Sequence, residues 1–139
     1  MTDLKALYWN RMVPELTVMD FSVSLHFYVD VLGFNIMIRR NEPDFAYVSL
    51  GEAQLMLEKY NPKGWNTAEL VRPLGRGINF QIEVEDIESV LARVRSNGFK
   101  LYRELRDNHY NIGETTACQR EFLVQDPDGY LLRFSQYIE

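Results

Sequence analysis

The side chains with the clearest chemical potential are two histidines and one cysteine. His109 lies in the segment Asp-Asn-His-Tyr-Asn, nine positions before Cys118, and Arg120 follows the cysteine closely. A histidine base and a nearby cation could hold Cys118 as a thiolate nucleophile. No third group that would orient the histidine is suggested, and a small buried thiol explains Cys118 as well. His26 falls within a predicted helix, where a lone histidine is more often a surface residue than a ligand.

Acidic side chains form a second group of chemical interest. They cluster where a predicted strand ends and a helix begins, as Glu83, Glu85, Asp86 and Glu88. Stabilisation by the helix dipole is enough to explain carboxylates at this position. The segment Leu-Gly-Arg-Gly at 74–77 is too short and too poorly placed for a phosphate-binding loop. The reactive residue types therefore define no catalytic constellation by themselves.

Length, composition and charge limit the class of protein. The chain has 139 residues, of which 46% are hydrophobic and 25% charged, and this suits one domain or two small modules that share a sheet. No apolar run approaches the roughly 20 residues that span a bilayer, and the N-terminus lacks a signal-peptide core. A formal charge of −5 argues against nucleic acid and favours cationic ligands. One cysteine excludes an internal disulfide, so we predict a cytoplasmic protein without membrane or nucleic-acid partners.

The elements that would position these side chains begin with a βαβββ module. Its strand, helix and three further strands are predicted over residues 12–18, 21–32, 34–40, 45–50 and 53–60. Asp20 is placed to cap the helix, and Gly33 is placed to end it. The apolar residues that recur at helical spacing are Phe21, Leu25, Tyr28 and Leu32. We take residues 12–60 as the first module.

The same order begins again after an irregular linker. This linker covers residues 61–76, and the second module covers residues 77–138. Asp86 caps the second helix, 66 positions after Asp20, and the Gly-Phe pairs that follow the two helices are 65 positions apart. The chain is therefore an internal duplication.

The second module differs from the first in its later strands. A strand over 77–84 precedes the helix, whose apolar face is formed by Ile87, Val90, Leu91 and Val94. Residues 100–118 are predicted to hold one strand and a long loop. The sequence Asp-Pro-Asp-Gly at 126–129 is typical of a β-turn, and we expect it to close a hairpin over residues 120–134.

Alternation along the strands separates an apolar face from a mixed face. The apolar sets are Pro14, Leu16 and Val18, Ala46, Val48 and Leu50, Ile78, Phe80 and Ile82, and Leu132 and Phe134. The other sets include Phe45 and Tyr47, Asn79 and Gln81, and Arg133. They fit either a solvated outer face or the lining of a ligand cup. The fold class is α+β, and we expect two tandem βαβββ modules to form a cup-shaped mixed sheet with the helices outside.

The motifs carry a resemblance to a known family. They are Val-Pro-Glu-Leu-Thr-Val-Met-Asp-Phe, Phe-Tyr-Val-Asp-Val-Leu-Gly-Phe, Phe-Ala-Tyr-Val-Ser-Leu-Gly, Gly-Ile-Asn-Phe-Gln-Ile-Glu-Val and Arg-Glu-Phe-Leu-Val-Gln-Asp-Pro-Asp-Gly. In this order, over residues 12–136, they resemble the vicinal oxygen chelate superfamily and, within it, the glyoxalase-like bleomycin resistance proteins. The resemblance implies the paired βαβββ fold, a homodimer, and ligand sites that often lie between subunits.

The resemblance also implies where the enzymes of this superfamily hold a divalent metal. Carried to this chain, the four ligand positions fall on Val13, Leu57, Asn79 and Arg133. Two are hydrocarbons, one is a weak neutral donor and one is a fixed cation, whereas a metal site needs histidine and carboxylate ligands. We therefore expect no metal, no cofactor and no catalytic residue at these positions.

Binding of a small molecule is the function that the resemblance then implies. Resistance proteins of this type sequester a cationic glycopeptide, and the ligand implied here is bleomycin-like. They stack aromatic rings on the glycopeptide and face its charge with acidic residues. The ligand-binding candidates are Phe45, Tyr47, Trp65, Asn79, Gln81, Tyr102, His109, Cys118 and Arg133. One departure is that Ala117-Cys118-Gln119 stands where the family commonly has Pro-Trp-Gly.

Three hypotheses stay open. The first is a metal-free dimeric binding protein of the bleomycin resistance type. The second is an enzyme of the same superfamily, a lyase, isomerase or dioxygenase, that uses nonstandard site residues. The third is a protein-interaction module with a shallow, solvated cup.

Overall fold

Two aspartates begin the two α-helices of the structure, a computed structural model that describes residues 8–139. The Asp20 carboxylate accepts a hydrogen bond from the Val23 amide at 3.3 Å, and the Asp86 carboxylate accepts one from the Ser89 amide at 3.2 Å. Each aspartate thereby satisfies one of the amides that a helix N-terminus leaves free. Both predicted helix starts are confirmed.

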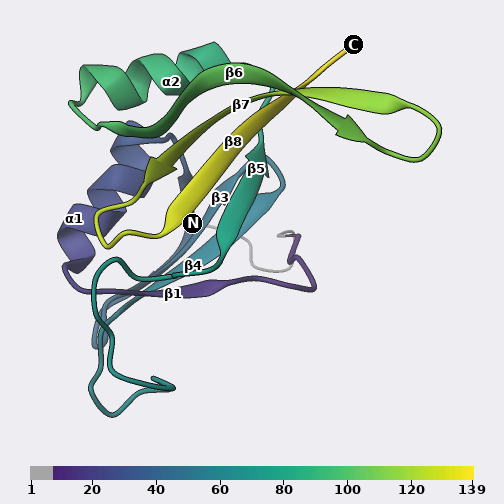
Figure 1. Cartoon of the computed structure of the whole chain (residues 1–139). Coiled ribbons are helices and arrows are strands. Elements are labelled where there is room, and N and C mark those ends of the chain that lie inside the picture. The colour runs from purple at the N-terminus through teal and green to yellow at the C-terminus, as the bar shows by residue number, and fades with distance from the viewer. Residues whose placement is uncertain (1–7) are drawn as a thin grey trace. The chain divides into compact units, whose positions relative to one another are not determined.

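The chain divides into two α+β units between Thr67 and Ala68. The first contains β1 (Glu15–Val18), α1 (Phe21–His26), the π-helical turn η1 (Phe27–Val31), β2 (Asn35–Arg40), β3 (Phe45–Leu50) and β4 (Ala53–Lys59) (Figure 1). The second contains β5 (Asn79–Glu83), α2 (Ile87–Ser96), β6 (Leu101–Asn111), β7 (Thr116–Gln125) and β8 (Leu131–Ile138). The predicted order of strand, helix and three strands is confirmed in both units.

Each unit holds one four-stranded mixed sheet. The strand orders are β1-β4-β3-β2 and β5-β8-β7-β6, so the two sheets repeat one topology. In each, the first strand pairs in parallel with the last, and the other pairs are antiparallel. A parallel pair requires a crossover connection, which the helix and the intervening strands supply. The joining of the two sheets into one cup stays a prediction.

The apolar faces of the strands form the cores. In the first unit Leu16 pairs with Leu57, Leu57 pairs with Ala46, and all three are buried. The predicted apolar face of α2 is buried completely. Two details differ from the sequence prediction. In the first unit, Leu25 is only partly buried because the helix widens into η1, which turns Phe27 and Val31 into the core. In the second unit, Ile78 is 50% exposed because it precedes β5.

The predicted loop within residues 100–118 is wrong, because this segment is part of a long β-hairpin. β6 and β7 pair from Leu101 and Val124 out to Asn111 and Thr116, and the outer part of the hairpin projects beyond β8 (Figure 1). The register shifts twice, between Leu101 and Arg103 and between Arg103 and Arg106. Such bulges interrupt the period-two alternation from which strands are predicted.

The Asp-Pro-Asp-Gly turn joins β7 to β8, as predicted. The Gly129 amide donates to the Asp126 carbonyl at 3.0 Å, and the Asp126 side chain accepts from the amides of Asp128 and Tyr130, both at 2.9 Å. Gly129 has φ of 104°, a conformation that L-residues rarely adopt. The turn is therefore fixed both by hydrogen bonds and by its glycine.

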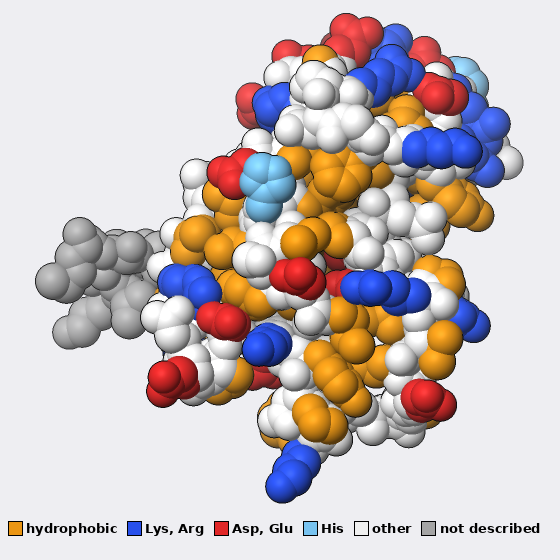
Figure 2. Space-filling view, turned by 90° about the vertical axis from the view of Figure 1, so that its left-hand side faces the viewer, with side chains coloured by type: hydrophobic (Ala, Val, Ile, Leu, Met, Phe, Trp, Pro, Cys, Tyr) orange, Lys and Arg blue, Asp and Glu red, His pale blue; other side chains and the backbone are white. Residues whose placement is uncertain are grey.

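The surface carries both signs of charge. On the face that Figure 2 shows, acidic and basic side chains are interspersed among apolar ones. Among residues 8–139, no helix is long and apolar enough to span a membrane.

Candidate functional site

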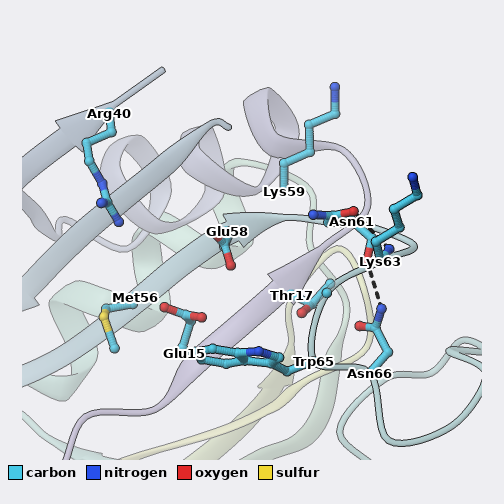
Figure 3. A pocket seen from close by; sticks show the side chains of 11 residues that line it. Glu15, Thr17, Arg40, Met56, Glu58, Lys59, Asn61, Lys63, Trp65 and Asn66 are labelled. Carbon is cyan, nitrogen blue, oxygen red and sulfur yellow. Dashed lines mark hydrogen bonds between the residues drawn. The ribbon is translucent and has the colours of Figure 1, made fainter. Parts of the chain in front are cut away.

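A pocket of about 690 Å³ lies in the first unit (Figure 3). Its walls come from β1, β4, the end of β2 and the loop that follows β4. The lining residues are Glu15, Thr17, Arg40, Met56, Glu58, Lys59, Asn61, Lys63, Gly64, Trp65 and Asn66. This volume is sufficient for part of a drug-sized ligand.

Strand register explains why these side chains share one surface. Glu15 pairs with Met56 and Thr17 pairs with Glu58 across β1 and β4. Glu58 in turn pairs with Phe45 of β3, which pairs with Arg40 of β2. Because paired residues point to the same side of a sheet, this row lies opposite the buried core face. The pocket is therefore built on the mixed face of the first sheet.

Glu15 and Glu58 bring two carboxylates together in the pocket. Desolvation raises the pKa of Glu15 above its ordinary value, the nearby Glu58 carboxylate raises it further, and the positive charge of Arg40 opposes both effects. In Figure 3 the amines of Lys59 and Lys63 point away from the two carboxylates. The Arg40 guanidinium lies 4.1 Å from the centre of the Phe45 ring. The lining therefore carries both signs of charge, and its two carboxylates are close enough to interact.

Removing the Glu15 charge is expected to stabilise the protein slightly at neutral pH. A raised folded-state pKa means that the folded protein holds the proton more strongly, so stability falls as pH rises through the interval between 4.5 and the raised pKa. At pH 7, Glu15→Gln should increase the melting temperature by about 2 °C, since Glu15 is exposed and screening keeps the repulsion small. Scanning calorimetry at pH 7 and pH 4 measures this change in melting temperature. The gain should vanish at pH 4, and the control variant Glu52→Gln should show no gain.

The loop after β4 is held in a defined conformation. The Asn61 carbonyl accepts from the Gly64 amide and from the Asn66 side chain, each at 2.8 Å, and the Asn61 side chain accepts from the Lys63 amide at 2.9 Å. These bonds present Trp65, whose side chain lines the pocket and is 99% exposed. The loop thus offers an indole ring on which a planar ligand could stack.

Phe45 and Tyr47 lie on the same sheet face but are covered. Phe45 is 5% exposed and lies under the Arg40 guanidinium. Tyr47 is 7% exposed, donates from its hydroxyl to Gln54 at 2.7 Å and meets the Trp9 ring edge-on at 4.9 Å. Burial raises the pKa of Tyr47. Neither ring lines the pocket, whereas Trp65 does.

The mixed face of the second sheet carries a polar network. Arg133 donates to Gln81 at 2.7 Å, and Gln81 donates to Ser135 at 3.2 Å. Arg133 also lies 3.6 Å from Glu121, a carboxylate that is 1% exposed. The sequence analysis did not select Glu121, although its place between apolar neighbours in Arg-Glu-Phe-Leu-Val is an available signal of burial.

The other predicted ligand-binding residues lie apart from this network. Asn79 is exposed at the start of β5, and Tyr102 is 63% exposed at the first register shift of β6. His109 and Cys118 are direct cross-strand partners, which brings the proposed dyad together, but on the face of β7 opposite to Glu121. Arg120 donates to Asp107 at 2.8 Å and 3.2 Å, so its charge is already paired.

The positions that the resemblance assigns to a metal do not suit one. Leu57 is fully buried on the core face, whereas its β4 neighbours Met56 and Glu58 line the pocket. Val13 is a hydrocarbon, and Arg133 is a cation committed to Gln81 and Glu121. Within residues 8–139, no three histidine, cysteine or acidic side chains gather as a metal-binding group.

Comparison with known proteins agrees with this geometry. Residues 10–134 match the model of the glyoxalase/bleomycin resistance protein/dioxygenase superfamily. The chain is 28% identical over 136 residues to a bleomycin resistance protein of Geobacillus stearothermophilus, with 91% of this chain and 96% of the relative covered. It is 30% identical over 126 residues to a probable lactoylglutathione lyase of Synechocystis, with 87% and 90% covered. The crystal structure of TioX from Micromonospora has the same fold, with a TM-score of 0.71, 21% identity, and 94% and 100% covered.

Proposed function

Because the chain belongs to the glyoxalase/bleomycin resistance protein/dioxygenase superfamily, we propose that it binds a bleomycin-type small molecule, cationic and partly aromatic, and sequesters it without turnover. The observation that carries this proposal is the pocket of the first unit, where two carboxylates and an exposed indole stand together. We propose further that the protein acts as a cytoplasmic homodimer, as its resemblance to the resistance proteins implies.

The pocket chemistry supports a cationic ligand with a flat ring. Glu15 and Glu58 can accept hydrogen bonds from an amine or guanidinium group, and such charge-assisted bonds are stronger than neutral ones. Trp65 offers the best aromatic surface for a ring or a cation. Met56 adds a polarisable apolar wall that adapts to different ligand shapes.

The test is a calorimetric titration of the protein with metal-free bleomycin, after the metal content has been measured. We expect saturable binding near one ligand per subunit. The absence of heat and of any tryptophan fluorescence change at high micromolar drug would reject a bleomycin-like ligand for this pocket.

Replacing Trp65 by alanine is expected to weaken the binding of metal-free bleomycin about tenfold, because stacking on one aromatic side chain contributes on the order of 1–2 kcal/mol. Trp65→Phe keeps an aromatic face and should lose threefold or less. The fixed hydrogen bonds of the loop do not involve the indole, so both variants should fold normally. Equal affinity of Trp65→Ala and the unchanged protein would exclude this stacking.

A lyase is the second candidate function, and the relatives named as lactoylglutathione lyases favour it. It would use nonstandard side chains at the four superfamily positions, which hold no histidine and no carboxylate. If the protein is a lactoylglutathione lyase, the purified protein supplied with divalent metal should form lactoylglutathione. Replacement of Arg133 should then abolish that activity. No product above the uncatalysed rate would leave the binding function.

A further inference from the structure

Glu121 is a buried carboxylate with one oxygen that no hydrogen bond satisfies. Its Oε1 atom accepts from the Asn108 side chain at 2.9 Å and from the Tyr110 hydroxyl. Within residues 8–139, its Oε2 atom has no hydrogen-bond donor, and the nearest charge is Arg133 Nη1 at 3.6 Å. A buried acceptor without a donor costs stability, so a native structure that keeps one calls for an explanation.

Two other polar atoms of the second unit are also buried without a hydrogen-bond partner in the described part of the chain. Arg133 Nε is a buried donor without an acceptor, and Gln119 Oε1 is a buried acceptor without a donor in the described part of the chain. Gln119 and Glu121 are two positions apart on β7 and point to the same face, and Arg133 reaches Glu121 from β8. The mixed face of the second sheet therefore holds two unused acceptors on β7 and an unused donor on β8, of which Glu121 and Arg133 lie close together.

We propose that this network, Gln119, Glu121 and Arg133, is a binding subsite for a carboxamide group of a ligand. A carboxamide donates through its N–H groups and accepts through its carbonyl oxygen, which matches the acceptors of Glu121 and Gln119 and the donor of Arg133.

Other ligand groups match less well. A carboxylate cannot donate to Glu121 and would meet its negative charge, while an ammonium group cannot accept from Arg133 and would meet its positive charge. The pair is already neutral, so a neutral group with both functions leaves no buried charge uncompensated. The subsite belongs to the second unit and does not depend on the function proposed for the pocket of the first.

In this proposal the ligand reaches Glu121 past two side chains that are open to solvent, Tyr110 and Arg133. Tyr110 is 40% exposed and the Arg133 side chain is 29% exposed, whereas the Glu121 side chain is 2% exposed. The Tyr110 hydroxyl is bonded to Glu121, and this bond raises the pKa of Tyr110. Binding as proposed requires these two side chains to move aside, because the Glu121 carboxylate is buried beneath them.

The experiment is an NMR titration of the full chain with benzamide, benzoate and benzylamine, which share one ring and differ in the polar group. Benzamide should give saturable shifts at Gln119, Glu121 and Arg133 at millimolar concentration, and the other two probes should bind at least tenfold more weakly. Equal or tighter binding of benzoate would overturn the proposal in favour of an anion site. No saturable shift at these residues up to 50 mM benzamide would also overturn it, leaving water as the partner of these atoms.

Variants separate the subsite from general effects on the hairpin. Glu121→Gln should weaken benzamide at least tenfold. Arg133→Lys keeps the positive charge but lacks the Nε donor, so it should weaken benzamide similarly even if Glu121→Gln fails to fold. Thr116→Ala lies on the opposite face of the same hairpin and should leave benzamide binding unchanged. Unchanged binding in Arg133→Lys would contradict the proposed contact.

Discussion

Replacing Glu15 and Glu58 together by glutamine is expected to weaken the binding of metal-free bleomycin about 100-fold. A hydrogen bond to a charged group contributes about 1.5–3 kcal/mol when buried, and partial exposure of the pocket reduces this, so roughly 1.4 kcal/mol for each carboxylate is the expected loss. The two residues lie on paired strands and line the same pocket, so one cation can contact both. Calorimetric titration of the double variant measures the change.

A matched control distinguishes the pocket from the overall charge. Glu42→Gln together with Glu52→Gln makes the same change in net charge within the first unit, outside the pocket. If long-range attraction alone governs binding, both double variants should weaken it equally. Added salt should then remove the difference in affinity between each double variant and the unchanged protein. If the pocket carboxylates contact the ligand, only the Glu15 and Glu58 variant should lose affinity strongly.

The affinity of the unchanged protein should also depend on pH. Ionisation of Glu15 creates the charge that a cation needs, and its raised pKa places this change above pH 4.5. Binding should therefore strengthen as pH rises through that pKa and then become constant.

The sequence was sufficient to predict the repeated modules because their signals are local. A capping aspartate, an apolar stripe and a glycine with positive φ stand at each helix, and Asp20, Asp86, Gly33 and Gly98 behave in the structure as their types suggest. These features depend on a few neighbouring residues and on backbone geometry. Packing of each helix against its sheet then stabilises the helix that these local signals start.

Features that depend on register were harder to predict. The outer hairpin escaped because residues 107–111 are mostly polar and exposed and so show no apolar alternation. The face of Leu57 was misplaced because a shift of one residue moves a side chain across the sheet. The pocket carboxylates were missed for a related reason. Glu15 and Glu58 are 43 positions apart, and only the parallel pairing of β1 with β4 brings them together.

The structure also changes the role of the predicted aromatic residues. Phe45 and Tyr47 were selected for their place on a strand, yet neighbouring side chains cover them, whereas Trp65 in the linker remains open. The family resemblance implied an aromatic site, but exposure depends on tertiary contacts such as the Arg40 guanidinium over Phe45. Ligand contact is thus decided by what the neighbours leave uncovered.

The second large effect concerns folding of the second unit. Gly129→Ala is expected to lower the free energy of unfolding by about 3 kcal/mol, as expected when backbone strain and a steric clash act together. At φ of 104°, an added Cβ would lie 2.6 Å from the Cα atom of Pro73 and 3.0 Å from the Leu74 amide nitrogen. Because the Leu74 amide donates to the Asp128 carbonyl at 2.8 Å, relief of the clash would disturb the bond that ties this segment to the turn.

Gly113→Ala supplies the comparison that divides this loss into its two causes. Gly113 has φ of 99°, nearly that of Gly129, but an added Cβ there would meet no atom within 4 Å. Its replacement should therefore cost only the backbone strain, on the order of 1 kcal/mol. Urea unfolding of both variants measures the two values, and the difference reports the contact with Pro73 and Leu74. Equal losses would mean that the 72–75 segment moves aside freely, and that the turn between β7 and β8 is held by its own hydrogen bonds alone.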